Sequence, residues 1–123
     1  MVDLLKLAKE RLGTFGVTVN ETALVFVGGK VEEKIRNFCN LAEVPNGLTH
    51  AAVDLICGEY LYQMQQLGEL NEFDVDAAVK SIDEGDVKIT FMDHASAADK
   101  LMALIGHLLD HDADLLAFRR LRW

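Results

Sequence analysis

Residues 48–67 read LTHAAVDLICGEYLYQMQQL, and their spacing predicts a helix that is apolar on nearly every side. A helix of that kind lies at the centre of its domain or between subunits, because a surface helix keeps one polar face. Glu59 is the exception, and we expect its carboxylate to reach water. The segment predicts a helical domain built around it. Its apolar members are Ala51, Ala52, Val53, Leu55, Ile56, Tyr60, Leu61 and Met64.

The segments before it predict two further helices. Residues 2–12 form a short amphipathic pattern that Gly13 ends. Residues 18–21, TVNE, predict a capping box, in which a threonine hydroxyl and a glutamate carboxylate satisfy orphan amides, and a helix follows to about residue 41. The glycine pair 28–29 inside that helix costs about 1 kcal/mol per glycine relative to alanine. We therefore expect a close helix crossing or a kink there.

The last long helical pattern begins after a capping serine at Ser96. It places Leu101, Ile105, Leu108 and Leu109 on one side, with Leu104 beside them, which predicts a core face. The pattern weakens around residues 111–112 and resumes to Phe118, so we expect an interruption at that point.

Between the helices the pattern changes to a period of two. Residues 79–82 (VKSI) and 87–91 (VKITF) alternate apolar and polar side chains around the turn DEGD at 83–86, which predicts a β-hairpin over residues 78–91. An isolated two-stranded hairpin is marginal in water, so this one must pack on the helices or pair with a neighbouring copy. Its apolar contacts are expected from Val79, Ile82, Val87, Ile89 and Phe91.

The fold class that follows is mainly α. We expect a small bundle of about four to five helices, with one β-hairpin inserted before the C-terminal helix, as a single domain over residues 1–123. A chain of this length buries about two thirds of the surface that its unfolded state exposes, so it needs no disulfide or metal to fold. No apolar run approaches the about 20 residues that span a bilayer, and no signal-peptide pattern is present. We expect a soluble, unsecreted protein.

The net charge of −8 limits the partners. Seven acids against one lysine fall between Glu69 and Asp86, and such a surface repels a phosphate backbone. Sequence-specific nucleic-acid binding is therefore disfavoured, although a protein that surrounds DNA without gripping it stays compatible with this charge. Acidic residues on a solvated, solubilising face explain the charge equally well.

The sequence contains no complete pattern of catalytic or metal-binding residues. Cys39 and Cys57 lie in apolar helical stretches without a basic neighbour, which predicts two buried free thiols. His107 and His111 stand one helical turn apart among acids, but no third strong ligand follows at a firm spacing. Motifs of nucleophile elbows, phosphate-binding loops and dinucleotide folds are lacking in the sequence. We expect no enzyme, no metal and no cofactor.

The tail FRRLRW at 118–123 combines the only tryptophan with three arginines in an otherwise acidic chain. Trp and Arg are enriched among binding hot spots, which favours a plug that docks on another protein, within a docking segment over 115–123. The alternative is a last helical turn that folds back on its own domain, with the arginines at the negative end of the helix dipole. The docking residues of the first interpretation are Phe118, Arg119, Arg120, Leu121, Arg122 and Trp123.

Several of these segments together resemble a known family. Residues 31–41 (VEEKIRNFCNL), 44–48 (VPNGL) and 52–61 (AVDLICGEYL) resemble the helical core of the head–tail connector (adaptor) proteins of tailed phages and prophages of Gram-positive bacteria. Residues 79–91 are similar to that family's hairpin and 118–123 to its terminal signature. The resemblance covers most of residues 20–123.

The resemblance implies a structural virion protein. Its subunits form a dodecameric ring beneath the portal protein, extend the DNA channel and receive a stopper or tail protein on the lower face. The expected location is the virion neck, and the host cytoplasm during assembly. The hairpin is then expected to extend a neighbour's sheet, and the tail to anchor in the portal or in the adjacent subunit. Acidic residues expected to line the channel are Asp83, Glu84 and Asp86.

Two other interpretations remain open. An acidic intracellular regulator, or DNA-mimic inhibitor, would occupy the basic groove of a nucleic-acid enzyme. A different neck component, such as a tail-completion protein, would be a small, all-helical domain of the same kind.

Overall fold

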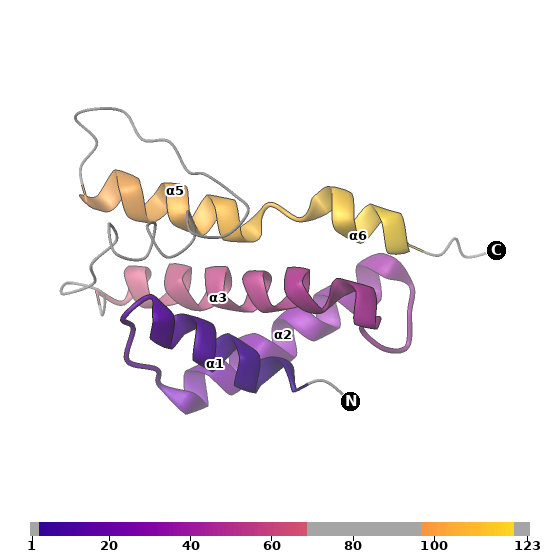
Figure 1. The fold of residues 1–123 in the computed structure, drawn as a ribbon, viewed down its shortest axis with the longest axis horizontal. Coiled ribbons are helices and arrows are strands. Elements are labelled where there is room, and N and C mark those ends of the chain that lie inside the picture. Colours follow the sequence, from indigo (N-terminus) through magenta and orange to yellow (C-terminus); the bar gives the residue numbers. More distant parts are fainter. Residues whose placement is uncertain (1–2, 69–96, 120–123) are drawn as a thin grey trace.

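The computed structural model describes residues 3–68 and 97–119, and every regular element within those ranges is helical (Figure 1). The prediction of a mainly α protein is confirmed at this level. The hairpin predicted over 78–91 lies outside the described residues and stays a prediction. Within the described part no helix is long and apolar enough to cross a membrane. The elements are α1 (Leu4–Thr14), α2 (Glu21–Cys39), the short 3-10 helix η1 (Asn46–Leu48), α3 (Thr49–Gln66), α5 (Ala97–Leu109) and α6 (Asp112–Phe118).

Helix α3 is the centre of the described bundle. It lies between α1 and α2 on one side and α5 on the other, and it packs against all three (Figure 1). The prediction that residues 48–67 form a central helix is therefore confirmed. The reason is that three neighbours leave this helix little surface for water. Its buried residues are Ala51, Ala52, Val53, Ile56, Cys57, Gly58, Tyr60, Leu61 and Met64.

The two adjacent glycines of α2 differ in their surroundings: Gly28 is packed against α1, and Gly29 is not packed. A Cβ at Gly28 would collide with the side chain of Leu5 on α1, so the two helices approach closely there. The expected close helix crossing is confirmed at Gly28. At Gly29 a Cβ would meet nothing within 4 Å, and packing inside the domain does not explain this second glycine.

The start of α2 differs from the predicted capping box. The N-cap is Asn20, whose side-chain oxygen accepts a hydrogen bond from the backbone N–H of Ala23 at 3.2 Å. The backbone N–H of Asn20 itself donates to the hydroxyl of Tyr60, at 2.8 Å. Because the N-cap is Asn20 and not Thr18, Glu21 is the first residue of the helix and the capping-box prediction is wrong. Glu21 instead pairs with Lys9 of α1.

The ends of the other helices differ from the predicted ones by a few residues. Helix α1 begins after Asp3, whose carboxylate accepts from the Lys6 N–H at 3.2 Å, and it continues through Gly13 to Thr14. The prediction that Gly13 ends the helix is wrong. Helix α2 ends at Cys39 because Asn40 adopts the left-handed conformation, with φ of 57°.

The predicted interruption of the last helical pattern is confirmed. Helix α5 ends at Leu109 and α6 begins at Asp112, so the helix is interrupted at residues 110–111. Helix α5 lies against α3 at Gly58, where an added Cβ would come within 2.8 Å of the Leu109 side chain. The predicted core face is confirmed, since Leu101, Leu104, Ile105 and Leu108 are buried and Leu109 is partly buried against the core.

Candidate functional site

Helix α6 packs on the C-terminal end of α2 and thereby forms one end of the bundle (Figure 1). Leu115 is its buried anchor. The backbone carbonyl of Leu115 lies 3.4 Å from the Cys39 thiol, which donates to it. Leu116, on the other side of α6, is 57 % exposed. The helix therefore presents one apolar side chain to its own domain and one to the outside.

The first two residues of the predicted docking tail contact their own chain. The ring of Phe118 rests on Gly47, where a Cβ would collide with it. The guanidinium of Arg119 lies over the Phe38 ring, 5.1 Å from its centroid, in a cation–π arrangement. Arg119 is extended, with φ of −70° and ψ of 128°, so the helix ends at Phe118 and the chain leaves it there.

A chain of charged side chains links α1, α3 and the start of α6. The Nε2 and Nδ1 atoms of His111 lie 3.1 Å from Asp54 and 2.8 Å from Asp114, each facing a carboxylate oxygen. On the other side of Asp54, the Arg11 Nε lies 3.1 Å away without the alignment of a hydrogen bond. The side chains of His111 and Asp54 are only 16 % and 20 % exposed. An imidazolium donates to both carboxylates, whereas a neutral ring donates to only one.

This junction also bears on the metal site that the sequence analysis set aside. His111 uses both ring nitrogens for carboxylates, and His107 does not join it. Across residues 3–68 and 97–119, no group of three histidine, cysteine or acidic side chains is arranged to hold a metal ion.

The cysteines are buried free thiols, as predicted. Burial raises the pKa of the Cys57 thiol to about 12, although the nearby Arg11 cation lowers it in part. Burial likewise raises the pKa of Cys39, against the opposing charge of Arg119. The sequence analysis missed both basic neighbours because they are distant along the chain. At neutral pH neither thiol ionises, so neither is an activated nucleophile.

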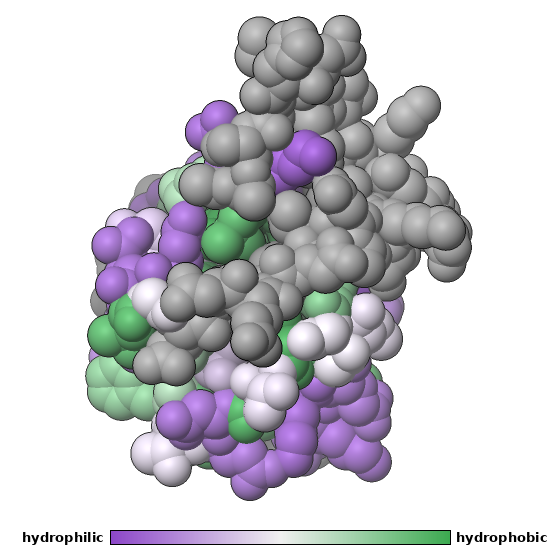
Figure 2. All heavy atoms as spheres, turned by 90° about the vertical axis from the view of Figure 1, so that its left-hand side faces the viewer, coloured by the Kyte–Doolittle hydropathy of each residue, from purple (hydrophilic) through white to green (hydrophobic). Residues whose placement is uncertain are grey.

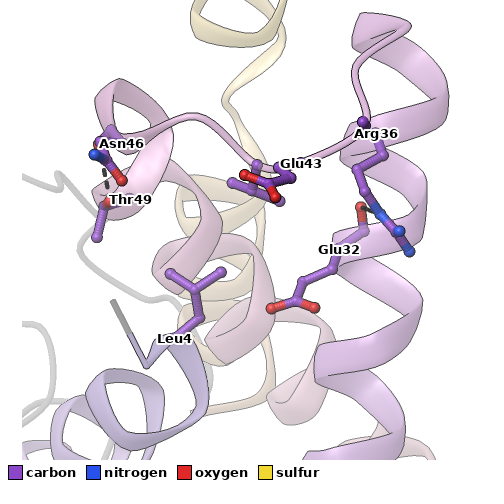
Figure 3. Close-up of a pocket in the computed structure, with 8 residues that line it drawn as sticks. Leu4, Glu32, Arg36, Glu43, Asn46 and Thr49 are labelled. Atoms are coloured by element: carbon purple, nitrogen blue, oxygen red, sulfur yellow. Dashed lines mark hydrogen bonds between the residues drawn. The ribbon is translucent and has the colours of Figure 1, made fainter. Parts of the chain in front are cut away.

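A cavity of about 420 Å³ opens between the start of α1, the second half of α2 and the connection from α2 to α3 (Figure 3). Figure 3 shows Glu32 extending from α2 toward Leu4, with Glu43 on the facing connection. The Arg36 Nε donates to the backbone carbonyl of Glu32 at 3.4 Å, and the Thr49 hydroxyl donates to that of Asn46 at 2.8 Å. The remaining lining residues are Ala42 and Val44.

Exposed hydrophobic side chains form a second feature of the surface. Val25 and Phe26, adjacent on α2, are 58 % and 69 % exposed. Figure 2 shows hydrophobic residues among hydrophilic ones on the end of the molecule that faces the viewer. Other large exposed hydrophobic residues of the described part are Tyr62, Leu67, Met102, Leu116 and Phe118.

The remaining predicted site residues lie outside the described residues. These are the hairpin contacts Val79, Ile82, Val87, Ile89 and Phe91, the channel acids Asp83, Glu84 and Asp86, and the tail residues Arg120, Leu121, Arg122 and Trp123. Their expected roles stay predictions.

Comparison of the chain with protein-family models, with curated proteins and with solved structures finds no match.

Proposed function

We propose that this chain is a structural virion protein, a head–tail connector subunit that forms a ring under the portal, extends the DNA channel and joins capsid to tail. The observation that carries the proposal is the end of α6. The helix stops at Phe118 and the chain continues from an extended Arg119 into the basic, aromatic segment 120–123. A segment that follows the helix with two arginines and a tryptophan supports an arm that docks on another subunit or on the portal.

The exposed apolar residues of α2 and α6 support assembly. A ring subunit contacts a neighbour on each side through two different surfaces. Phe26 on α2 and Leu116 on α6 are large side chains exposed on different elements. Val25 and Phe26 are adjacent and both exposed, and neighbouring exposed apolar side chains are typical of a surface that is covered in an assembly.

The charge of the chain suits a channel that DNA passes through. A net charge of −8 offers few cations to release counterions from phosphates, so DNA is not gripped. In this proposal Asp83, Glu84 and Asp86 of the predicted hairpin line the channel. The partners are identical copies in a dodecameric ring, the portal protein and a stopper or tail protein, in the virion neck.

Co-purification with the portal protein tests the proposal. The full chain should bind the portal as a ring visible by electron microscopy. Deletion of residues 120–123 should abolish this binding while circular dichroism shows unchanged helicity, because Phe118 and Arg119 keep their contacts with Gly47 and Phe38. A truncated chain that binds the portal as well as the full chain would contradict the docking role of the tail. Virions without density for this chain at the neck would contradict the function itself.

The high negative charge also supports a second candidate, an acidic inhibitor that mimics DNA. Such a protein would bind a nucleic-acid enzyme, with an affinity that falls steeply as salt is raised. Deletion of residues 120–123 would leave this binding unchanged, because the tail is basic. The same truncated variant therefore separates the two candidates.

A further inference from the structure

The cavity beside α1 combines an apolar floor with charged side chains at its edge. Leu4 and Val44 contribute aliphatic surface, and Glu32 and Glu43 contribute two carboxylates from opposite sides (Figure 3). Its volume of about 420 Å³ falls within the range of roughly 300–1,000 Å³ of typical ligand pockets. Such a site fits a ligand that is both apolar and cationic.

The C-terminal segment of the chain has that chemistry. Residues 120–123 read RLRW and alternate a guanidinium with a large apolar side chain. Guanidinium groups match carboxylates in geometry and charge, and a leucine or an indole covers aliphatic surface. Arg36 at the edge of the cavity adds a cation that an indole ring can stack against.

The starting point of the tail favours the cavity of another copy. Arg119 lies on Phe38, and Phe38 is six residues after Glu32 and two after Arg36. At about 100° per residue, Phe38 lies on a different side of α2 from both cavity residues. Four residues reach at most about 14 Å, while α2 with its side chains is about 10–12 Å wide. A tail would have to pass round α2 or over the α2–α3 connection to reach its own cavity.

We propose that the cavity lined by Leu4, Glu32, Glu43 and Val44 receives residues 120–123 of a second copy of this chain. Arg120 and Arg122 pair with the two glutamates, and Leu121 and Trp123 cover the apolar floor. The inference rests on the proposed ring, and it names the surface of the adjacent subunit in which the tail is anchored.

Cross-linking between isotopically labelled copies tests this contact. A photoreactive benzoylphenylalanine replaces Leu121 in the full chain, and a mixture of heavy and light chains is irradiated at high concentration, alone and with the portal. Mass spectrometry should place cross-links between a heavy and a light chain at Leu4 or within residues 32–49. Cross-links that stay within one chain, that map to another surface, or that are lacking altogether would each overturn the proposal.

Charge variants test the pairing directly. The double variant Glu32→Gln, Glu43→Gln should lower the yield of these cross-links about tenfold, which corresponds to about 1.4 kcal/mol for the loss of two ion pairs. The matched control Glu10→Gln, Glu33→Gln changes two exposed acids of α1 and α2 outside the cavity and should leave the yield unchanged. Equal losses in the two double variants would overturn the pairing.

The cross-linking and portal-binding results together distinguish a failure of this inference from a failure of the proposed function. If portal rings form but the cross-links do not map to the cavity, the docking site is wrong and the connector function stands. If the cross-links map to the cavity but the wild-type chain neither binds the portal nor lies at the neck, the function is wrong and the docking site stands.

Discussion

The imidazole of His111 joins Asp54, on α3, to Asp114, on α6, with nitrogen–oxygen distances of 3.1 and 2.8 Å. This contact is made at the interruption between α5 and α6, at residues 110–111. A side chain that bridges two elements at such a point fixes the position of the following helix.

His111→Ala should therefore loosen α6. We expect the free energy of unfolding to fall by about 1–3 kcal/mol, because Asp54 and Asp114 lose their shared hydrogen-bonding partner. Urea denaturation measures the loss, and hydrogen exchange should rise in α6 more than in α1. His50→Ala, at an exposed position of α3, is the control. Equal losses in the two variants would show that the bridge contributes nothing.

Phe118→Ala and Leu116→Ala should have different effects, because Phe118 contacts its own domain and Leu116 is exposed. The Phe118 ring covers Gly47, so its removal should cost about 1–2 kcal/mol of stability and increase exchange in α6. Leu116 is exposed, and its removal should leave thermal stability within about 0.5 kcal/mol of the wild type. In the proposed ring, Leu116→Ala should instead weaken assembly on the portal. A larger stability loss at Leu116 than at Phe118 would contradict this arrangement.

The two adjacent glycines of α2 provide a matched pair. Gly29→Ala should raise the free energy of unfolding by about 1 kcal/mol, since the helix gains propensity and the new methyl group meets nothing. Gly28→Ala should gain less or lose stability, because Leu5 must leave its position at a cost of about 0.5–1.5 kcal/mol. Chemical denaturation of both variants gives the comparison. A Gly28 variant as stable as the Gly29 variant would show that the α1–α2 crossing is loose.

Alkaline pH should weaken the fold through Cys57. Its pKa is raised from 9.0 to about 12, so the folded state favours the neutral thiol. The resulting stability is fully present below about pH 9 and is lost as the pH rises from there toward 12, by at most about 1.4 kcal/mol per pH unit. Urea denaturation at pH 8 and pH 10.5 should show a steeper loss in the wild type than in Cys57→Ala. Parallel losses would contradict the assignment to this thiol.

The central helix and the interruption near His111 could be predicted because both depend on local pattern. Residues 48–67 carry an apolar surface wide enough for three neighbours, and the spacing of leucines fails at residues 111–112. The start of α2 could not be predicted in the same way. Its amide partner is the hydroxyl of Tyr60, 40 residues away, and a capping rule considers only nearby residues.

The candidate site was less predictable than the fold. The sequence analysis singled out His111 as a possible metal ligand, but its partner Asp54 stands 57 residues earlier and carries no pattern that relates the two. The cavity was missed for a similar reason. Glu32 and Glu43 come together only because Asn40 turns the chain back beside α2, and the tertiary path of a loop leaves no periodic signal in the sequence.

The hydrogen bond from the Asn20 amide to the Tyr60 hydroxyl has a consequence for the order of folding. The N-terminal turn of α2 lacks this partner until residue 60 has been synthesised and α3 has packed. We therefore expect α1 and α2 of a nascent chain to pack stably only once α3 has been synthesised. Truncated chains ending before Tyr60 should for that reason be cut by proteases far faster than chains that extend beyond α3.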